Sequence, residues 1–376
     1  MQCEQSIWTQ RAGWMRPAQL PNQAQLVLVF GARAALLHQP ALDALRATYP
    51  QAQFFGCSTA GEIAGAHIYD DSIAATAIRF GQTAFHIATI ALEADDDQVA
   101  RGAALARLLP PAGLRHVLLL ADGLVANTSA ILEGMNRHLP AGVAVTGGLA
   151  ADGVAFAETV VLCDGQPRSG CVAALGLYGK HLWIGYGSQG GWDSFGPERL
   201  ITRSVGNVLY ELDGKSALSL YKRYLGEYAH ELPAAGLRFP LSLRGPGGQP
   251  GLVRTILSVD EQAQSITFAG DMPQGSYARL MKANFDRLLD GAIGAARASM
   301  LHGAQPELAL LISCVGRKEL LMQRIEEEVE GVYETFGQRP VLAGFYSYGE
   351  IAPFRNGTGC ELHNQTMTIT TLAEIP

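Results

Sequence analysis

The sequence predicts an α/β protein of two domains, each built from repeated strand–helix–strand units with mixed sheets. The chain has 376 residues, more than one hydrophobic core usually serves. Hydrophobic residues make up 48% and charged residues 17%, a balance typical of well-filled cores rather than of disorder. Three times, an apolar run of strand length is followed by a helical segment and a second strand that ends in glycine. This is the pattern of a buried parallel strand pair.

The three units share one order of elements: strand, helix, strand, and then a further alternating strand. The first three elements are predicted at 25–30, 40–48 and a run into 55–58 in the first unit, 116–120, 127–138 and 143–148 in the second, and 308–314, 318–336 and 340–344 in the third. The further strands are predicted at 72–79, 158–163 and 364–371. This internal similarity indicates a repeated fold element.

The remaining segments complete two domains. Strands are predicted at 170–178, 181–187 and within 200–212, a helix at 217–224, a Gly/Pro-rich exposed loop at 243–251, a hairpin at 252–259 and 265–269, and a long Ala-rich helix at 276–300. The turn at 213–216 caps the helix that follows it, so we place the domain boundary there. The predicted parts are an N-terminal extension at 1–24, a first domain at 25–214 and a second domain at 215–376.

Composition and charge argue against several classes of partner and indicate a cellular compartment. The net charge is −7 without a basic patch, which argues against nucleic acid and anionic membranes. No apolar run reaches the ~20 residues of a membrane span, and the N-terminus lacks the pattern of a signal peptide. The six cysteines form no tight pairs in the sequence, which suggests a reducing compartment. Cys163 and Cys171 can face each other across a hairpin, and a metal site there would need two more ligands. We therefore expect a soluble cytoplasmic protein.

Two loops of similar sequence stand 288 positions apart. Gly56 to Ile63 and Gly344 to Ile351 both contain glycine, four residues and then Gly-Glu-Ile, with a serine inside the loop. Ligands bind beyond the carboxyl ends of parallel strands, where these loops are predicted to lie. The loops are either two ends of one ligand site or a duplicated turn in which the glutamate caps the backbone. Together with neighbouring strand ends they give these candidates for one or two clefts: Cys57, Ser58, Glu62, Asp122, Thr146, Cys314, Arg317, Ser347 and Glu350.

The chemistry of these candidates suits a small zwitterion. Backbone N–H groups and arginine would hold a carboxylate, and glutamate or aspartate would hold an ammonium group. An enzyme with Cys57 or Cys314 as nucleophile is the alternative, but spacing supplies no base. The sequence contains no Walker loop, no Gly-x-Ser-x-Gly elbow and no HExxH spacing. We therefore expect neither an enzyme nor a metal site. A purely structural interaction protein is a further alternative.

At these residues the chain resembles the FIST family of bacterial sensory proteins. The motifs that carry the resemblance to the N-terminal FIST domain lie at 56–63, 146–152, 187–190, 195–197 and 212–217. Those that carry the resemblance to the C-terminal FIST domain lie at 269–275, 313–318, 345–351 and 363–366. Gly190 to Ser194 depart from the family pattern, in which many members carry a basic residue.

The resemblance implies a non-enzymatic sensor that binds a small, amino-acid-like ligand and acts on a partner such as a histidine kinase. The expected contacts are Cys57, Ser58, Thr59, Glu62, Arg317, Ser347, Glu350 and His363. A stand-alone FIST protein is also similar to the subgroup called NosP, which implies haem b, nitric-oxide sensing and control of cyclic-di-GMP and biofilm signalling through a two-component system. The candidate axial ligands are His67, His181 and His363. The sequence leaves open the ligand, the partner, whether a homodimer forms, and whether the two Gly-Glu-Ile loops share one cleft.

Overall fold

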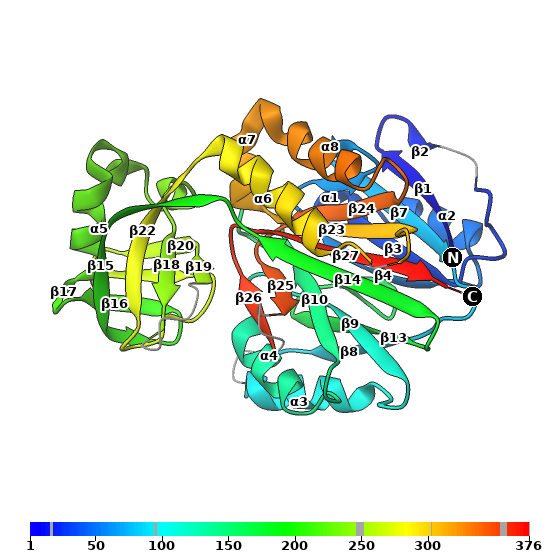
Figure 1. Cartoon of the computed structure of the whole chain (residues 1–376), viewed down its shortest axis with the longest axis horizontal. Helices are drawn as coiled ribbons and strands as arrows, with labels where there is room; N and C mark the ends of the chain where they lie inside the picture. The colour runs from blue at the N-terminus through cyan, green and yellow to red at the C-terminus, as the bar shows by residue number, and fades with distance from the viewer. Residues whose placement is uncertain (16–17, 94–95, 246–251, 302, 354–358, 376) are drawn as a thin grey trace.

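Three mixed β-sheets and one antiparallel sheet form the framework of the protein, which confirms the predicted α/β class. The computed structural model describes residues 1–15, 18–93, 96–245, 252–301, 303–353 and 359–375. Figure 1 shows the three mixed sheets and their helices in one body, with the antiparallel sheet in a separate lobe on the left. In the described segments, no helix is long and apolar enough to span a membrane.

The first mixed sheet contains the first predicted unit. In spatial order its strands are β12 (Gln166–Arg168), β11 (Val161–Cys163), β4 (Gln53–Ser58), β3 (Leu26–Gly31), β7 (Ser72–Arg79), β1 (Gln2–Thr9) and β2 (Gly13–Met15). The helices of this unit are α1 (Arg33–Leu36) and α2 (Gln39–Thr48). Strands β1 and β2 lie within residues 1–24, the segment predicted as an N-terminal extension.

The second mixed sheet contains the second unit. Its strands, in spatial order, are β26 (Cys360–His363), β25 (Glu350–Pro353), β10 (Ala144–Leu149), β9 (Leu114–Ala121), β13 (Cys171–Tyr178) and β8 (Ala84–Ala91). Its helices are α3 (Gln98–Leu108) and α4 (Thr128–Asn136), whose N-caps Asp97 and Asn127 accept backbone hydrogen bonds. The strand predicted at 158–163 forms over the shorter range of β11 and pairs with β4 of the first sheet, while β13 is the third strand of this unit's own sheet.

The third mixed sheet contains the third unit. Its strands are β14 (Leu182–Gln189), β27 (Met367–Glu374), β23 (Leu308–Cys314), β24 (Val341–Ser347), β5 (Glu62–Ala64) and β6 (His67–Tyr69). Its helices are α6 (Phe285–Ala298), α7 (Val315–Leu321), η3 (Met322–Arg324) and α8 (Ile325–Thr335). The single helix predicted at 318–336 is therefore broken. The break lies at Met322, whose φ is +47°, a value outside the helical region.

The three units are joined by a cyclic exchange of strands. In each unit the first two strands pair in parallel, and the third strand pairs antiparallel to the first. The strand that follows the parallel pair always leaves for another unit's sheet: β5 follows β4 but pairs with β24, β11 follows β10 but pairs with β4, and β25 follows β24 but pairs with β10. Each sheet is thus completed by a strand from another unit.

The central core lies where the inner faces of the three sheets meet. Leu28, Leu118 and Leu310, one from the first strand of each unit, belong to a single buried cluster. Alternate residues of β3 face the other way: Val27 and Val29 pack in the cluster that contains the apolar residues of α2. This in–out alternation follows the two-residue period of a strand and explains why each sheet carries its helices on the outer face.

The lobe is formed by the chain between β14 and α6. Its antiparallel strands, in spatial order, are β19 (Leu252–Arg254), β18 (Leu241–Arg244), β22 (Tyr277–Ala283), β15 (Trp192–Val205), β16 (Val208–Leu212), β21 (Ser265–Phe268) and β20 (Ile256–Asp260), with β17 (Lys215–Ser216) beside β16. Its helices are α5 (Ala217–Leu225), η1 (Gly226–Glu231) and η2 (Ala234–Leu237). The lobe has its own hydrophobic core. The predicted boundary at 214/215 falls inside it, between the paired strands β16 and β17.

The helix predicted at 276–300 is wrong in its first third. Residues 277–283 form β22, which pairs with both β15 and β18. Buried positions alternate at Ala278 and Leu280, so this segment has the period of a strand in spite of its helix-forming residues. The helix begins at Phe285, after Asn284 accepts a hydrogen bond from the backbone N–H of Arg287.

Candidate functional site

The loops predicted to bind a ligand gather at one end of the three-sheet body and bind to one another. The backbone N–H of Ala60 donates to Tyr346 O at 2.8 Å, and that of Leu149 donates to Gly349 O at 2.8 Å. The third side of the ring is closed by Ala151 N–H, which donates to Ser58 O at 2.9 Å. The two Gly-Glu-Ile loops therefore meet in a packed interface together with the corresponding loop of the second unit.

The carboxyl group of Glu62 is fully buried in this interface. Its Oε1 lies 2.5 Å from Thr59 Oγ1, and its Oε2 is hydrogen-bonded by Ser72. Burial raises the pKa of Glu62 to about 8, although both hydroxyl groups act in the opposite direction. In its neutral form the carboxyl group of Glu62 links β5 to the start of β7 by a hydrogen bond, which is a structural role.

Glu350 has the same arrangement in the third unit. Its Oε1 lies 2.7 Å from Ser347 Oγ, while Thr366 donates to its Oε2 from N at 3.1 Å and from Oγ1 at 2.9 Å. Ser347 Oγ also lies 3.2 Å from Ser313 O, so when Glu350 is protonated the hydroxyl can donate there and accept a hydrogen bond from the carboxyl O–H. Burial raises the pKa of Glu350 to about 8. The duplicated loops thus support the alternative of a repeated turn with a capping glutamate.

The other buried candidates are also engaged within the protein. Ser58 Oγ accepts a hydrogen bond from Val160 N at 3.0 Å. Arg317 and Glu328 form a fully buried ion pair, and Arg317 also donates to Leu288 O at 2.7 Å. Burial raises the pKa values of Cys57 and Cys314, so neither thiol is activated as a nucleophile.

Asp122 and Thr146 hold strand ends and neighbouring strands together. Asp122 Oδ2 accepts hydrogen bonds from Gly170 N at 2.8 Å and from Ser169 Oγ at 3.1 Å. Thr146 Oγ1 accepts from Thr370 Oγ1 at 2.7 Å and lies 2.8 Å from His116 Nε2. Neither residue lines the large cleft described below.

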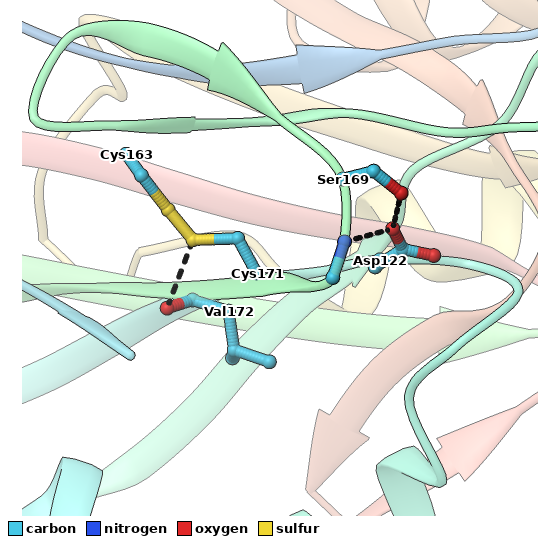
Figure 2. The surroundings of a disulfide bond; sticks show 6 residues. Asp122, Cys163, Ser169, Cys171 and Val172 are labelled. Atoms are coloured by element: carbon cyan, nitrogen blue, oxygen red, sulfur yellow. Dashed lines mark hydrogen bonds between the residues drawn. A yellow bond between two sulfur atoms is a disulfide. The ribbon is translucent and has the colours of Figure 1, made fainter. Parts of the chain in front are cut away.

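A disulfide joins Cys163 of β11 to Cys171 of β13, close to Asp122 (Figure 2). The two cysteines are 8 positions apart and both are buried. The bond ties the first mixed sheet to the second. These are the two cysteines that the sequence placed opposite each other across a hairpin; Cys3, Cys57, Cys314 and Cys360 form no disulfide.

A cleft of about 520 Å³ lies between the three-sheet body and the lobe. One wall is formed by α4 and β26, and the other by β18, β19 and the segment before β22. The lining residues are Ser129, Leu132, Glu133, Asn136, Arg137, Leu243, Gly245, Leu252, Arg254, Asp271, Pro273, Ser276, Cys360, Glu361 and Leu362. Its volume is in the usual range for ligand sites, about 300–1,000 Å³. None of the eight predicted contact residues lines it, although His363 follows Leu362 directly.

The guanidinium group of Arg254 is the most buried charged group of this cleft. Arg254 is 4% exposed and donates from Nη1 to Leu362 O at 2.8 Å and from Nε to Asp271 O at 3.2 Å. Burial lowers its pKa to about 10, so it stays cationic at neutral pH. A Cβ atom on Gly270 would lie 2.8 Å from Arg254 Nε, so the absence of a side chain there makes room for the guanidinium.

The segment that contains His363 docks the lobe onto the body. Gln365 Nε2 donates to Thr255 Oγ1 at 3.0 Å, and Gln365 O accepts from Trp192 Nε1 at 3.0 Å. Burial and the charge of Arg254 lower the pKa of His363 to about 4. The segment acts as an anchor between two parts of the chain.

The three histidines considered as alternative axial ligands of haem lie in different segments of the described chain. His67 is an exposed residue of β6 that lies 3.7 Å from Glu326. His181 Nδ1 lies 2.9 Å from Ile375 O. The 520 Å³ cleft is not lined by any of the three, and five charged side chains line it instead. Because haem requires an apolar slot with an axial ligand, the residues that line this cleft do not fit that cofactor.

Two domain models of a known protein family match this chain. The FIST N domain matches residues 25–215, and the FIST C domain matches residues 217–353. The protein belongs to the FIST family, whose domains are sensory domains of signal transduction.

Similarity to individual proteins is more distant. An uncharacterized protein of Methanocaldococcus jannaschii is 24% identical over 230 residues, which are 57% of this chain and 43% of that protein. The chain thus matches less than half the length of that relative. The crystal structure of a cyanuric acid hydrolase from A. caulinodans aligns with a TM-score of 0.33 and 8% identity over 99% of this chain and 98% of that chain. A likeness this weak carries no argument about activity.

The sequence reasoning missed the cleft although it named its neighbours. Gly270, Asp271 and Pro273 belong to a recognised family motif, and Cys360 and Leu362 come just before another. The Gly-Asp-x-Pro pattern could have indicated the cleft, because it places a glycine next to a carboxylate. Arg254, which donates to Asp271 O, lies in a predicted hairpin, where an arginine looks like an ordinary surface residue.

Proposed function

We propose that this protein is a ligand-binding sensor that takes up a small molecule between its body and its lobe and acts on a separate signalling protein. The observation that carries the proposal is the 520 Å³ cleft, whose walls come from both parts. A ligand there contacts α4 and β26 on one side and the lobe on the other. Ligands that bridge two parts of a chain favour the arrangement in which both walls are in contact with them.

The connections between the two parts support such a response. The chain passes between them only at the β14–β15 and β22–α6 junctions. Polar contacts across the interface include Arg254 to Leu362 O and Gln365 to Thr255, and a small apolar cluster joins Trp192 and Met281 of the lobe to Leu288, Leu320 and Leu321 of the body. A partner such as a histidine kinase would recognise the altered arrangement.

The ligand is proposed to be a small organic molecule, in keeping with the amino-acid-like ligand that the family resemblance implies. The lining of the cleft does not favour haem, so nitric-oxide sensing is not part of the proposal. Of the eight residues expected to contact a ligand, Ser58, Glu62 and Glu350 form hydrogen bonds within the loop interface, and the contact of these eight residues with a ligand stays a prediction.

Distance measurements between the two parts test the proposal. Spin labels at Val205→Cys in the lobe and Leu108→Cys in α3 occupy positions that are 70% and 51% exposed. Compounds from a metabolite library that raise the melting temperature should change the measured distance distribution. In the matched Ser129→Trp variant, which fills the cleft from α4, the same compounds should change neither quantity. Stabilising compounds that leave the distances unchanged in every case would refute the sensor mechanism.

A further inference from the structure

The cleft contains a buried positive charge whose hydrogen-bonding partners are all neutral. The guanidinium of Arg254 donates to three carbonyl oxygens, those of Val253, Asp271 and Leu362. Within the described parts of the chain, no carboxylate lies within ion-pair distance of it. The carboxylates of Asp271 and Glu361 act on this charge only from beyond ion-pair distance, so a bound anion in direct contact would lower the cost of burying it.

From this geometry, we infer that the cleft binds a small monocarboxylate with an apolar body, whose carboxylate is held by Arg254. The inference rests on the proposed function and names the ligand chemistry of the same site. Nε and Nη1 of Arg254 already donate to carbonyl groups, so the carboxylate would accept its charge-assisted hydrogen bonds from the N–H groups of Nη2, which has no partner among the described residues. The position of Arg254 is prepared in advance by the carbonyl contacts and by the space over Gly270, so little side-chain entropy is lost when the ligand binds.

The other charges of the cleft select against multiply charged anions. Glu133, Asp271 and Glu361 stand against only two arginines, and Glu133 is already paired with Arg137. A phosphate dianion would meet two or more uncompensated carboxylates, whereas a monoanion adds one charge beside Arg254. Repulsion between like charges disfavours the dianion.

The apolar walls set the shape of the remainder of the ligand. Leu132, Leu243, Leu252 and Leu362 line the cleft together with Pro273. Asp271 Oδ1 is buried without a hydrogen-bond partner in the described residues, and its residue lines the cleft. A hydroxyl or amino group on the ligand can donate to this oxygen.

Matched carboxylate and amide probes test the inference. The probes are 4-methylpentanoate, 2-hydroxy-4-methylpentanoate and leucine, each paired with its carboxamide, and inorganic phosphate serves as the dianion. Binding to the full chain is measured by ligand-observed NMR and calorimetry. At least one carboxylate should bind about tenfold to a hundredfold more tightly than its amide, the scale for charged hydrogen bonds. Phosphate should not compete with it.

Two arginines of the same cleft provide matched variants. Arg254→Met should abolish the preference for carboxylate over amide, and Arg254→Lys should reduce it. Arg137→Met, at a rim position where the side chain is 62% exposed, should keep it. A preference that survives Arg254→Met in a folded protein overturns the inference, and so does equal binding of carboxylates and amides by the unmodified chain. The second result does not depend on the folding of any variant.

The outcomes also separate this inference from the sensor proposal. If uncharged compounds occupy the cleft and move the lobe, the sensor stands and the carboxylate assignment fails. If carboxylates bind through Arg254 but the lobe distances stay unchanged, the site stands and the sensor mechanism fails.

Discussion

The glycine at the same place in each unit makes the repeat testable. Gly56 of β4 pairs with Val29, and Gly344 of β24 pairs with Leu311, in the parallel registers of the first and third units. A Cβ on Gly56 would lie 1.7 Å from Val29 O, and one on Gly344 would lie 1.8 Å from Leu311 O. Ordinary contacts begin at 3.4 Å, so in the third unit the two strands would have to separate by about 1.6 Å. The obstructing atoms are backbone, which cannot rotate away.

Gly344→Ala and Gly56→Ala should therefore each lower the free energy of unfolding by about 3 kcal/mol or more, the upper part of the range for overpacked cores. Urea denaturation followed by circular dichroism measures the change. The matched control is Gly245→Ala, since a Cβ there meets no described atom within 4 Å, and its effect should stay within about 0.5 kcal/mol. An unchanged midpoint in Gly344→Ala would refute the argument that close backbone approach requires glycine in these strands.

Three other predictions concern a buried carboxyl group, the disulfide and a buried ion pair. Because burial raises the folded-state pKa of Glu350 to about 8 from 4.5, the contribution of this group to stability should fall as pH rises from about 5 to 8. Glu350→Gln should flatten this part of the urea stability profile, with a gain of about 2 kcal/mol at pH 6; a steeper slope would contradict the assignment. Cleavage of the Cys163–Cys171 bond should cost about 2–3 kcal/mol, seen as a lower melting temperature with reductant in the wild type and no response in Cys163→Ser. Arg317→Met should cost about 3–5 kcal/mol because it leaves Glu328 buried and unpaired, and Arg317→Met/Glu328→Leu should recover much of that; an equally unstable double variant would show that packing dominates.

The parallel strand pairs and their glycines could be predicted because they depend on local pattern. Strand β7 was predicted at 72–79 and has those bounds, since its alternation and flanking turns lie in one segment. The exchange of β5, β11 and β25 between sheets could not be predicted, because a strand of three or four residues carries no information about which edge it joins. Strand β22 was predicted as helix for a related reason: its partners β15 and β18 override the preference of its own residues.

For the site, the sequence drew attention to the right loops but not to what they do. Glu62 and Glu350 are paired with hydroxyl groups from β7 and from the segment before β27, partners that only the fold brings near. Arg254 gave no local signal, because its burial depends on β26 from the far end of the chain.

The cyclic strand exchange also decides which pieces of this chain can exist on their own. The segment matched by the FIST N domain contains β5 and β10, but their edge partners β24 and β25 come after residue 340. Expressed alone, that segment would expose these and other unpaired strand edges, which invite pairing with other molecules. The boundary between the two family domains therefore does not separate two parts that fold independently. Truncation at residue 215 should yield a fragment that aggregates.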